Sequence, residues 1–290
     1  TAALVLSQST TGGLPTRNWS SGTFEGAEAI SGERMAETIL KEGDTCYGCA
    51  VRCKRVVDVD EGPYEVDPRY GGPEYESIAT LGSYCGVDNL EAVARANQLC
   101  NMYGMDTISC GATIAWAMDC FEQGLLTTEE TGGVDLSFGN AEAMVKMVEM
   151  IGEREGLGEV LGEGSARAAE ILGIGEDLVV AVKGRELPAH MPQAKRDMAL
   201  LYAVNPGGAD HTVSEHGTSY TRFAEGVATL DLLDPQPPNV LSDEMVRYAL
   251  YSQHLISAVD SVCVCKFVYG PAWQLYSVEE WIDALKAITG

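Results

Sequence analysis

Residues 88–124 read DNLEAVARANQLCNMYGMDTISCGATIAWAMDCFEQG and predict two consecutive helices, which indicates a mainly helical fold. Asp88 and Glu91 have the spacing of a capping box, in which two side chains bind the free amides at the start of a helix. Gly104 is expected to end the first helix, because glycine adopts the left-handed conformation at little cost. Asp106 is expected to cap the second helix, which fills the rest of the stretch.

The same criteria predict further helices on both sides of this stretch. They are a short helix at 32–41, one capped by Asn140, and those at 165–172, 242–258 and 277–290. The β-branched run Leu178–Lys183 is the clearest strand candidate and a candidate domain boundary. The first 45 residues are otherwise expected to be mostly irregular, and residues 54–86 are expected to form an ordered loop.

The composition is that of a soluble globular protein, with 290 residues of which 46% are hydrophobic and 21% charged. The formal net charge of -24 makes nucleic acid a poor partner. No apolar run reaches the roughly 18 residues of a membrane span, and the chain does not open like a signal peptide. Nine cysteines suit a reducing compartment better than a disulfide scaffold. We therefore expect a cytoplasmic protein, with most of Cys85, Cys100, Cys110 and Cys120 in the core.

A group of three cysteines, Cys46-x2-Cys49-x3-Cys53, has a spacing that can fold one loop around a metal centre. A fourth ligand is offered late in the chain by Cys263 or Cys265. Structural zinc sites usually combine two separated pairs of ligands, and the sequence has no second pair. The pattern therefore favours a [4Fe-4S] cluster over zinc.

Several motifs, taken in order, resemble the C-terminal domains of the tungsten-dependent aldehyde:ferredoxin oxidoreductases. The cysteine loop is one of them. The family's two pterin motifs, of the form D-x-x-G-L-(D/C), resemble Asn101–Asp106 and Asp260–Cys265. The other matching segments are Gly13–Asn18, Gly72–Glu76 followed by Leu81-Gly82, Leu99–Ser109, Val182–Gly184 and Gly208–His211. The resemblance covers essentially the whole chain.

The resemblance implies a mainly α, multihelical fold with few short strands. It implies two domains, at residues 1–175 and 176–290, which correspond to the second domain and a truncated third domain of the family. Family members also have an N-terminal β-rich domain that forms a base under the tungstopterin. We expect this domain to be absent from the chain.

The resemblance also implies which residues bind the cofactors. Cys46, Cys49, Cys53 and Cys265 would hold the [4Fe-4S] cluster, with Cys263 as the alternative to Cys265. A tungsten (or molybdenum) bis-pterin would be bound by Asn101, Met105, Asp106, Asp260 and Val264. Carboxylates suit a pterin because its ring and amino N–H groups are donors. At Asn101 an amide replaces the family's first carboxylate, and Asp106 is equally suited to cap a helix, two roles that can coexist.

Glu76 and His211 match the family's active-site glutamate and histidine, which implies that they act near the tungsten. A carboxylate can remove a proton during aldehyde hydration, and an imidazole can donate to the carbonyl oxygen. The alternatives are Glu74 for the base and Glu215 or His216 for the histidine, whereas His190 and His254 are expected to be structural.

The sequence departs from the family at two places. Some members bridge two subunits through a metal held by a glutamate and a histidine. Arg95 stands where that glutamate aligns, and no histidine precedes His190, so we expect any homodimer to lack this metal. The segment Met191–Arg196 differs from the family's usual Asp-Pro-Arg pattern, which leaves substrate or cofactor contacts there open.

The resemblance implies an oxidoreductase that converts aldehydes to carboxylic acids and passes the electrons to a ferredoxin-like carrier. A related tungsten enzyme that reduces a carboxylate or an aromatic acyl thioester is the first alternative. The second alternative, for this fragment alone, is an inactive or electron-transfer-only module, because the fragment can lack either cofactor.

Overall fold

The computed structural model describes residues 4–215, 225–232, 234–269 and 277–290. Within these residues helices dominate, and the strands form two sheets of two strands each, which confirms the predicted mainly α class. The chain divides into two compact units. Unit 1 comprises residues 1–191 and 207–209, and unit 2 comprises residues 192–206 and 210–290. The predicted domain division after residue 175 stays a prediction.

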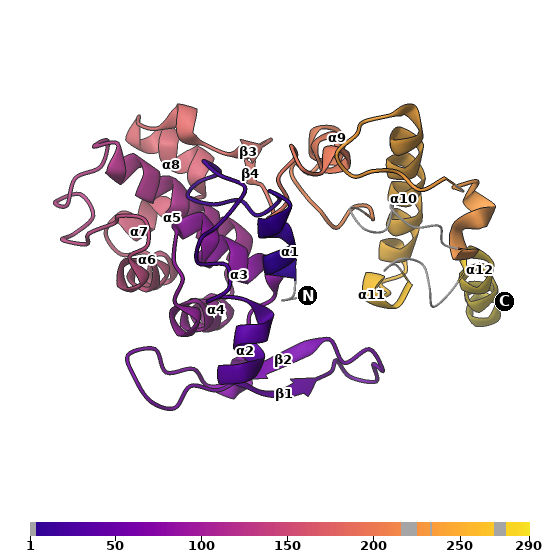
Figure 1. Cartoon of the computed structure of the whole chain (residues 1–290), viewed down its shortest axis with the longest axis horizontal. Helices are drawn as coiled ribbons and strands as arrows, with labels where there is room; N and C mark the ends of the chain where they lie inside the picture. The colour runs from indigo at the N-terminus through magenta and orange to yellow at the C-terminus, as the bar shows by residue number, and fades with distance from the viewer. Residues whose placement is uncertain (1–3, 216–224, 233, 270–276) are drawn as a thin grey trace. The chain divides into compact units, whose positions relative to one another are not determined.

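Unit 1 contains eight of the described α-helices, two short hairpins and three 3₁₀ turns (Figure 1). In chain order they are α1 (Leu4–Thr10), α2 (Gly32–Thr38), β1 (Leu40–Asp44), β2 (Lys54–Val57), η1 (Pro68–Tyr70), α3 (Tyr75–Leu81), η2 (Ser83–Cys85), α4 (Leu90–Tyr103), α5 (Thr107–Glu122), α6 (Ala141–Glu153), α7 (Leu157–Leu161), α8 (Ser165–Leu172), η3 (Glu176–Leu178), β3 (Ala181–Val182) and β4 (Arg185–Glu186).

Helix α5 forms the centre of unit 1 and packs against α3, α6 and α8. The consecutive residues Cys110–Met118 are all buried, so the helix is covered around its whole circumference. A helix that is apolar on all sides is typical of a protein core. The indole N–H of Trp116 donates a hydrogen bond of 2.9 Å to the carbonyl of Gly175, which satisfies the one polar group of that side chain.

Helix α3 lies unusually close to α5. A Cβ atom on Gly111 of α5 would lie only 2.5 Å from the carbonyl carbon of Thr80 in α3, so a glycine is needed at this crossing. Thr80 Oγ1 also donates to the carbonyl of Thr107 over 3.0 Å. The hydroxyls of Ser77 and Thr107 are 2.8 Å apart. These contacts fix the position of α3 on the core.

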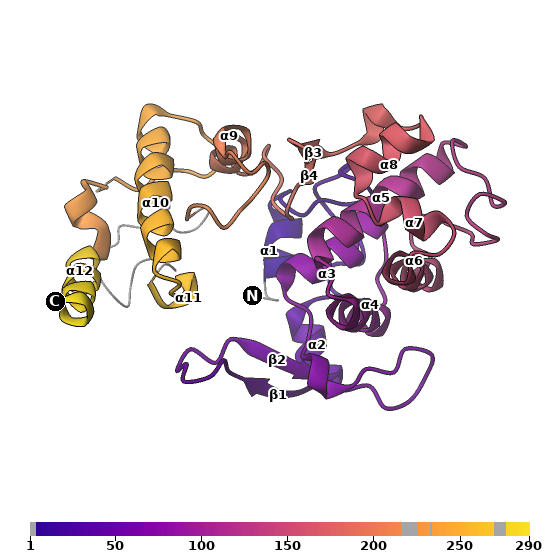
Figure 2. The ribbon, with the colours of Figure 1, turned by 180° about the vertical axis from the view of Figure 1, so that it is seen from behind.

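The prediction of an ordered loop over residues 54–86 is wrong, because this segment contains β2 and α3. All residues from Ser77 to Leu81 are buried, so α3 has no extended polar face that would give its sequence a helical period. The helix predicted at 32–41 ends at Thr38. Residues 40–44 instead form β1, which pairs antiparallel with β2. The hairpin lies beside α2 and α4, on the side of unit 1 away from α8 (Figures 1 and 2).

The predicted helix ends are mostly confirmed. Gly104 ends α4 in the left-handed conformation with a φ of 70°, and the side chains of Asp106 and Asn140 accept first-turn amide hydrogen bonds in α5 and α6. The predicted cap of α4 is wrong by one residue. Asn89, and not Asp88, accepts the amide hydrogen bond at its start.

The strand predicted over Leu178–Lys183 is mostly wrong. Its first residue belongs to the turn η3, and only Ala181–Val182 form a strand, which pairs with β4. Lys183 and Gly184 connect the two strands with φ angles of 56° and 77°. Two consecutive residues with positive φ are typical of the tight turns that match the twist of a hairpin.

Unit 2 contains the helices α9 (Arg196–Val204), α10 (Asp243–Ser261), α11 (Lys266–Tyr269) and α12 (Val278–Thr289), with a 3₁₀ turn η5 (Glu225–Leu230), in its described part. Ser242 caps α10, and Ser277 with Glu280 forms a complete capping box on α12, so both predicted starts are confirmed. Leu232, Met245 and Tyr248 form a small buried cluster beside α10.

Cys85, Cys100, Cys110 and Cys120 are all buried and form no disulfide, as predicted for core cysteines. Burial raises the pKa of the Cys85 thiol well above its usual range. In the part of the chain that the structure describes, no helix combines the length and apolar character needed to cross a membrane.

Candidate functional site

The carboxylate of Glu76 lies against two consecutive residues of a segment of unit 1 that is distant in sequence. Glu76 lies in the first turn of α3, and its side chain is 14% exposed. Its Oε2 accepts a hydrogen bond of 2.7 Å from the main-chain N–H of Ala189. Its Oε1 lies 3.1 Å from Nε2 of His190, whose side chain is 3% exposed. Oε2 is therefore fixed by a main-chain donor, and Oε1 lies within ion-pair distance of a buried imidazole.

Two buried tyrosines fasten residues 187–191 to the core. Tyr75, which directly precedes Glu76, donates a hydrogen bond of 2.6 Å to the carbonyl of Ala189. Tyr84 of η2 donates one of 2.9 Å to the carbonyl of Leu187. The ring of Tyr75 also lies 5.6 Å from the imidazole of His190, centroid to centroid. Burial raises the pKa of Tyr75 well above its usual range, so its hydroxyl remains a proton donor at all ordinary pH values.

Glu74 has different surroundings, although only one residue separates it from Glu76. It occupies the position before α3, its side chain is 48% exposed, and its carboxylate forms an ion pair with Arg55 of β2. Arg55 also donates a hydrogen bond of 3.3 Å to the carbonyl of Cys53. Glu74 therefore connects the start of α3 to the β1–β2 hairpin and faces a fixed cation.

The cysteine loop connects β1 to β2. Cys46 is exposed, and Cys49 and Cys53 are partly exposed. The loop bends back on itself, because the N–H of Cys49 donates to the carbonyl of Cys46 over 3.1 Å. The N–H of Val51 points at Sγ of Cys49 over 3.4 Å. Arg52 has a φ of 52°, a left-handed conformation that turns the chain toward Cys53.

The late cysteines lie in unit 2, between α10 and α11. Asp260 is in the last turn of α10, Cys263 and Cys265 are exposed, and Val264 is partly buried. Cys263 has a φ of 57°, and its N–H donates to the carbonyl of Asp260 over 3.0 Å, so the chain reverses directly after the helix. This tight turn brings the motif residues 260–265 into one short exposed segment.

Lys266 anchors this segment to the residues that follow His211. Its Nζ donates a hydrogen bond of 2.9 Å to the carbonyl of Ser214 and lies 3.9 Å from Oε1 of Glu215. Burial lowers the pKa of Lys266, and the neighbouring carboxylates oppose this effect. One partly buried side chain therefore links the residues that follow His211 to those that follow Cys265.

The first predicted pterin motif lies at the turn between α4 and α5. Asn101 and Asp106 are exposed and Met105 is partly buried. Asn101 Nδ2 donates to the carbonyl of Tyr70 over 3.3 Å, and Asp106 Oδ1 accepts from the N–H of Ser109 over 2.8 Å. Asp106 thus has the capping role that its sequence position predicts.

His211 is partly buried and belongs to unit 2, whereas Glu76 belongs to unit 1. Glu215, the alternative to His211, is almost completely buried. His216, the second alternative, lies outside the described residues. His254 is exposed on α10, where its ring lies 6.5 Å from that of Tyr251.

The sequence of the chain matches a family of known proteins. The family model described as "Aldehyde ferredoxin oxidoreductase, domains 2 & 3" matches residues 1–290. The chain belongs to this family. The aldehyde ferredoxin oxidoreductase resemblance noted from the sequence motifs is thereby confirmed.

Curated relatives of the chain carry the name of this family. The tungsten-containing aldehyde ferredoxin oxidoreductases of Pyrococcus abyssi and Thermococcus kodakarensis are each 36% identical over 295 residues, covering 100% of this chain and 45% of those proteins. The WOR-like subunit of an aliphatic sulfonate oxidoreductase from Pyrococcus furiosus is 32% identical over 205 residues, or 68% of this chain and 32% of that protein. The chain spans about half the length of the aldehyde ferredoxin oxidoreductases that it matches.

A solved structure has a similar fold. It is titled as the active site complex BamBC of benzoyl coenzyme A reductase in complex with 1,5 dienoyl-CoA, and it matches with a TM-score of 0.59. The match covers 78% of this chain and 33% of that chain, at 19% identity. At this identity the likeness supports the fold alone.

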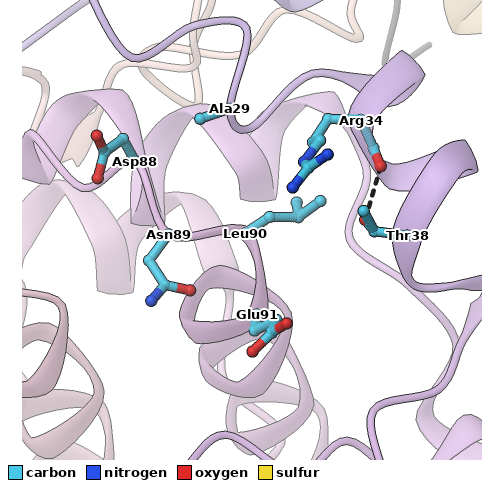
Figure 3. A pocket seen from close by; sticks show the side chains of 7 residues that line it. All are labelled: Ala29, Arg34, Thr38, Asp88, Asn89, Leu90 and Glu91. Atoms are coloured by element: carbon cyan, nitrogen blue, oxygen red, sulfur yellow. Dashed lines mark hydrogen bonds between the residues drawn. The ribbon is translucent and has the colours of Figure 1, made fainter.

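A surface hollow of about 350 Å³ lies between α2 and the start of α4 (Figure 3). Its lining residues are Ala29, Arg34, Thr38, Asp88, Asn89, Leu90 and Glu91. These residues differ from those that the aldehyde ferredoxin oxidoreductase resemblance assigns to catalysis or cofactor binding. The hollow is a wide surface depression with both acidic and basic groups.

The contact between Glu76 and His190 is the feature that sequence reasoning missed. The motif pattern assigned Glu76, and His190 was expected to be structural. One feature of the sequence could have indicated a contact. His190 lies inside the apolar run Leu187–Met191, and a buried imidazole requires a polar partner. The sequence did not indicate which partner it would be.

Proposed function

We propose that this chain forms the catalytic part of an enzyme that oxidises aldehydes to carboxylic acids with a tungsten (or molybdenum) bis-pterin and a [4Fe-4S] cluster. The observation that carries the proposal is the partly buried carboxylate of Glu76, bound at Oε2 by a main-chain amide, in a chain that belongs to the aldehyde ferredoxin oxidoreductase family. An oriented, partly desolvated carboxylate is suited to act as a general base.

Oxidation of an aldehyde with water gives a carboxylic acid, two protons and two electrons. We assign to Glu76 the removal of a proton from the water that adds to the carbonyl carbon. His211 would donate to the carbonyl oxygen. When bound, a pterin-held metal would accept the electron pair, and an iron–sulfur cluster at Cys46, Cys49, Cys53 and Cys265 would pass electrons on singly.

The environment of the two glutamates favours Glu76 over Glu74 as the base. The Glu74 side chain is 48% exposed, and its carboxylate is engaged in an ion pair with the guanidinium of Arg55. The Glu76 side chain is only 14% exposed, accepts a hydrogen bond from a main-chain amide and lies beside an imidazole.

The cysteine loop fits the [4Fe-4S] cluster that the family implies. Cys46, Cys49 and Cys53 are free thiols on one loop, and the N–H of Val51 is directed at the sulfur of Cys49. Hydrogen bonds to thiolate sulfur are one means by which proteins tune the reduction potential of a cluster. Cys265 would supply the fourth thiolate.

The pterin motif residues also fit their proposed ligand in chemistry. Asp106 and Asp260 are exposed carboxylates, and Asn101 is an exposed amide. These acceptors suit the N–H groups of a pterin. Met105 and Val264 would contact the ligand through their backbone and apolar side chains.

A ferredoxin-like carrier is the proposed electron acceptor, and the reducing cytoplasm is the proposed location, because nine unpaired cysteines require protection from oxidation.

The second candidate function keeps the cofactors and changes the substrate. It rests on the 32% identity to the subunit of an aliphatic sulfonate oxidoreductase.

The cluster is tested by a matched pair of serine variants. The anaerobically reconstituted chain should contain about four iron atoms with the signal of one reducible cluster. Cys265→Ser should lose this signal, and Cys263→Ser should retain it. The reverse result would assign the fourth position to Cys263, and no iron in the unsubstituted chain would contradict the cluster.

The reaction is tested with the complete, cofactor-containing enzyme. Aldehyde-dependent reduction of a viologen dye should fall by about 100-fold or more in Glu76→Gln, the range expected on loss of a general base. Glu74→Gln should remain within about tenfold of the unsubstituted enzyme. Turnover of aliphatic sulfonates without turnover of aldehydes would favour the second candidate.

A further inference from the structure

We propose that Arg55 raises the reduction potential of the [4Fe-4S] cluster held by the cysteine loop, residues 46–53. This inference rests on the proposed function, in which Cys46, Cys49 and Cys53 are cluster ligands. Arg55 lies in β2, two residues after Cys53, and its Nη1 donates a hydrogen bond of 3.3 Å to the carbonyl of Cys53. The positive charge of Arg55 is therefore in direct contact with the main chain of a proposed ligand.

The guanidinium of Arg55 is more buried than the carboxylate that pairs with it. The side chain of Arg55 is 16% exposed, whereas that of Glu74 is 48% exposed. A guanidinium stays protonated in proteins, so this charge is permanent. Water and salt screen an exposed charge more than a buried one. The ion pair therefore leaves part of the positive charge of Arg55 effective at the cysteine loop.

Arg55 and Glu74 belong to two segments that approach each other closely. A Cβ atom on Gly72 would lie 2.8 Å from Cγ1 of Val57 and 3.3 Å from Cβ of Arg55, so the residues before α3 pack tightly against β2. The carboxylate of Glu74 reaches the guanidinium from the position that directly precedes α3. This packing keeps the cation beside the cysteine loop.

A fixed cation at the loop favours the reduced form of a cluster. Reduction adds one electron, so the cluster with its thiolates becomes more negative by one charge. Net charge, hydrogen bonds and solvent exposure set the reduction potential of such clusters. The chain has a formal net charge of -24, which opposes the addition of an electron, and a buried cation offsets this effect locally.

The reduction potential is measured in the anaerobically reconstituted chain, without turnover. The cluster is titrated with dithionite in the presence of redox dyes, and its reduced form is followed by EPR. In Arg55→Met, the ratio of reduced to oxidised cluster at a fixed solution potential should fall by about threefold to tenfold relative to the unsubstituted chain. A tenfold fall corresponds to about 59 mV for a one-electron couple. Arg55→Lys, which keeps the charge, should recover most of the loss.

Lys54→Met is the matched control, because it removes the same charge from the neighbouring residue. Lys54 is exposed, and consecutive side chains of a strand point to opposite faces, so its loss should change the ratio by less than about twofold. Equal shifts in Arg55→Met and Lys54→Met would show that only the net charge of the chain matters, and would overturn the proposal.

Glu74→Gln is an independent test, because it leaves Arg55 unchanged. Loss of the anion should strengthen the field of the cation, so the reduced fraction should rise at the same solution potential. A lower or unchanged reduced fraction would contradict the proposal, even if the Arg55 variants take up no cluster.

The two proposals fail in different measurements. An absence of iron in the unsubstituted chain contradicts the cluster of the proposed function, and this inference with it. A complete cluster whose reduction potential is the same in Arg55→Met and in the unsubstituted chain contradicts the role of Arg55 alone.

Discussion

Replacement of Gly111 by alanine should destabilise unit 1 and displace α3, the helix that carries Glu76. Gly111 has ordinary helical backbone angles, so the substitution acts through space and not through backbone strain. The added Cβ would lie 2.5 Å from the carbonyl carbon and 2.6 Å from the carbonyl oxygen of Thr80. Both atoms belong to the backbone of α3, which cannot rotate away as a side chain can.

The expected change in the free energy of unfolding combines one stabilising effect with two destabilising effects. Alanine favours a helix interior over glycine by about 1 kcal/mol. Overpacking of a core contact costs about 1–3 kcal/mol, because α3 and α5 have to separate by about 1 Å. Moving the two helices apart also weakens the hydrogen bonds that join Ser77 and Thr80 to Thr107, each of which contributes about 1 kcal/mol. We expect a net loss of about 1–4 kcal/mol in the free energy of unfolding.

Urea unfolding followed by circular dichroism measures the loss, and hydrogen exchange of residues 75–81 shows whether α3 is the element that moves. Gly43→Ala in β1 is the control. Its Cβ would lie 4.0 Å from the nearest atom, the carbonyl oxygen of Lys54, so we expect a change near zero. Equal stability of Gly111→Ala and the unsubstituted chain, with unchanged exchange in α3, would refute the tight crossing.

Two further predictions concern buried polar groups of unit 1. Glu186 accepts hydrogen bonds of 2.7 and 2.8 Å from the N–H and the hydroxyl of Ser165 at the start of α8, so Glu186→Ala should lower the free energy of unfolding by about 2–4 kcal/mol. Glu170→Ala on the exposed face of α8 should change it little, and equal effects would contradict the cap. Burial raises the pKa of Cys85, so above about pH 9 the unfolded chain loses a thiol proton that the folded chain keeps. The contribution of this thiol to the free energy of unfolding is therefore complete below that pH and is lost as the pH rises. In urea titrations at alkaline pH, the free energy of unfolding of Cys85→Ala should decline less steeply with pH than that of the unsubstituted chain. An equal decline would exclude the contribution of this thiol.

The sequence predicted those features whose causes are local. Gly104, Asp106 and Asn140 end or cap their helices as expected, because a cap requires only the residues within one turn of it. The cysteine spacing predicts the loop between β1 and β2 in the same way. The family resemblance predicted the fold class, because the ordered motifs extend over the whole chain.

The errors occur where distant residues decide the outcome. Helix α3 is buried on nearly all sides, so its sequence lacks the alternation of polar and apolar faces on which helix prediction depends. Residues 40 and 41, predicted as the end of a helix, instead belong to β1, because residues 40–44 pair with β2 across the cysteine loop. Tertiary contacts of this kind override local propensity.

The candidate site also combines features with local and with distant causes. A sequence motif identified Glu76, and the spacing of the three early cysteines identified the predicted cluster loop. Only the tertiary structure paired Glu76 with His190 and Glu74 with Arg55. A residue's chemical type is fixed by the sequence, but the partners of a buried carboxylate depend on which distant segments the packing of the core brings within hydrogen-bond distance.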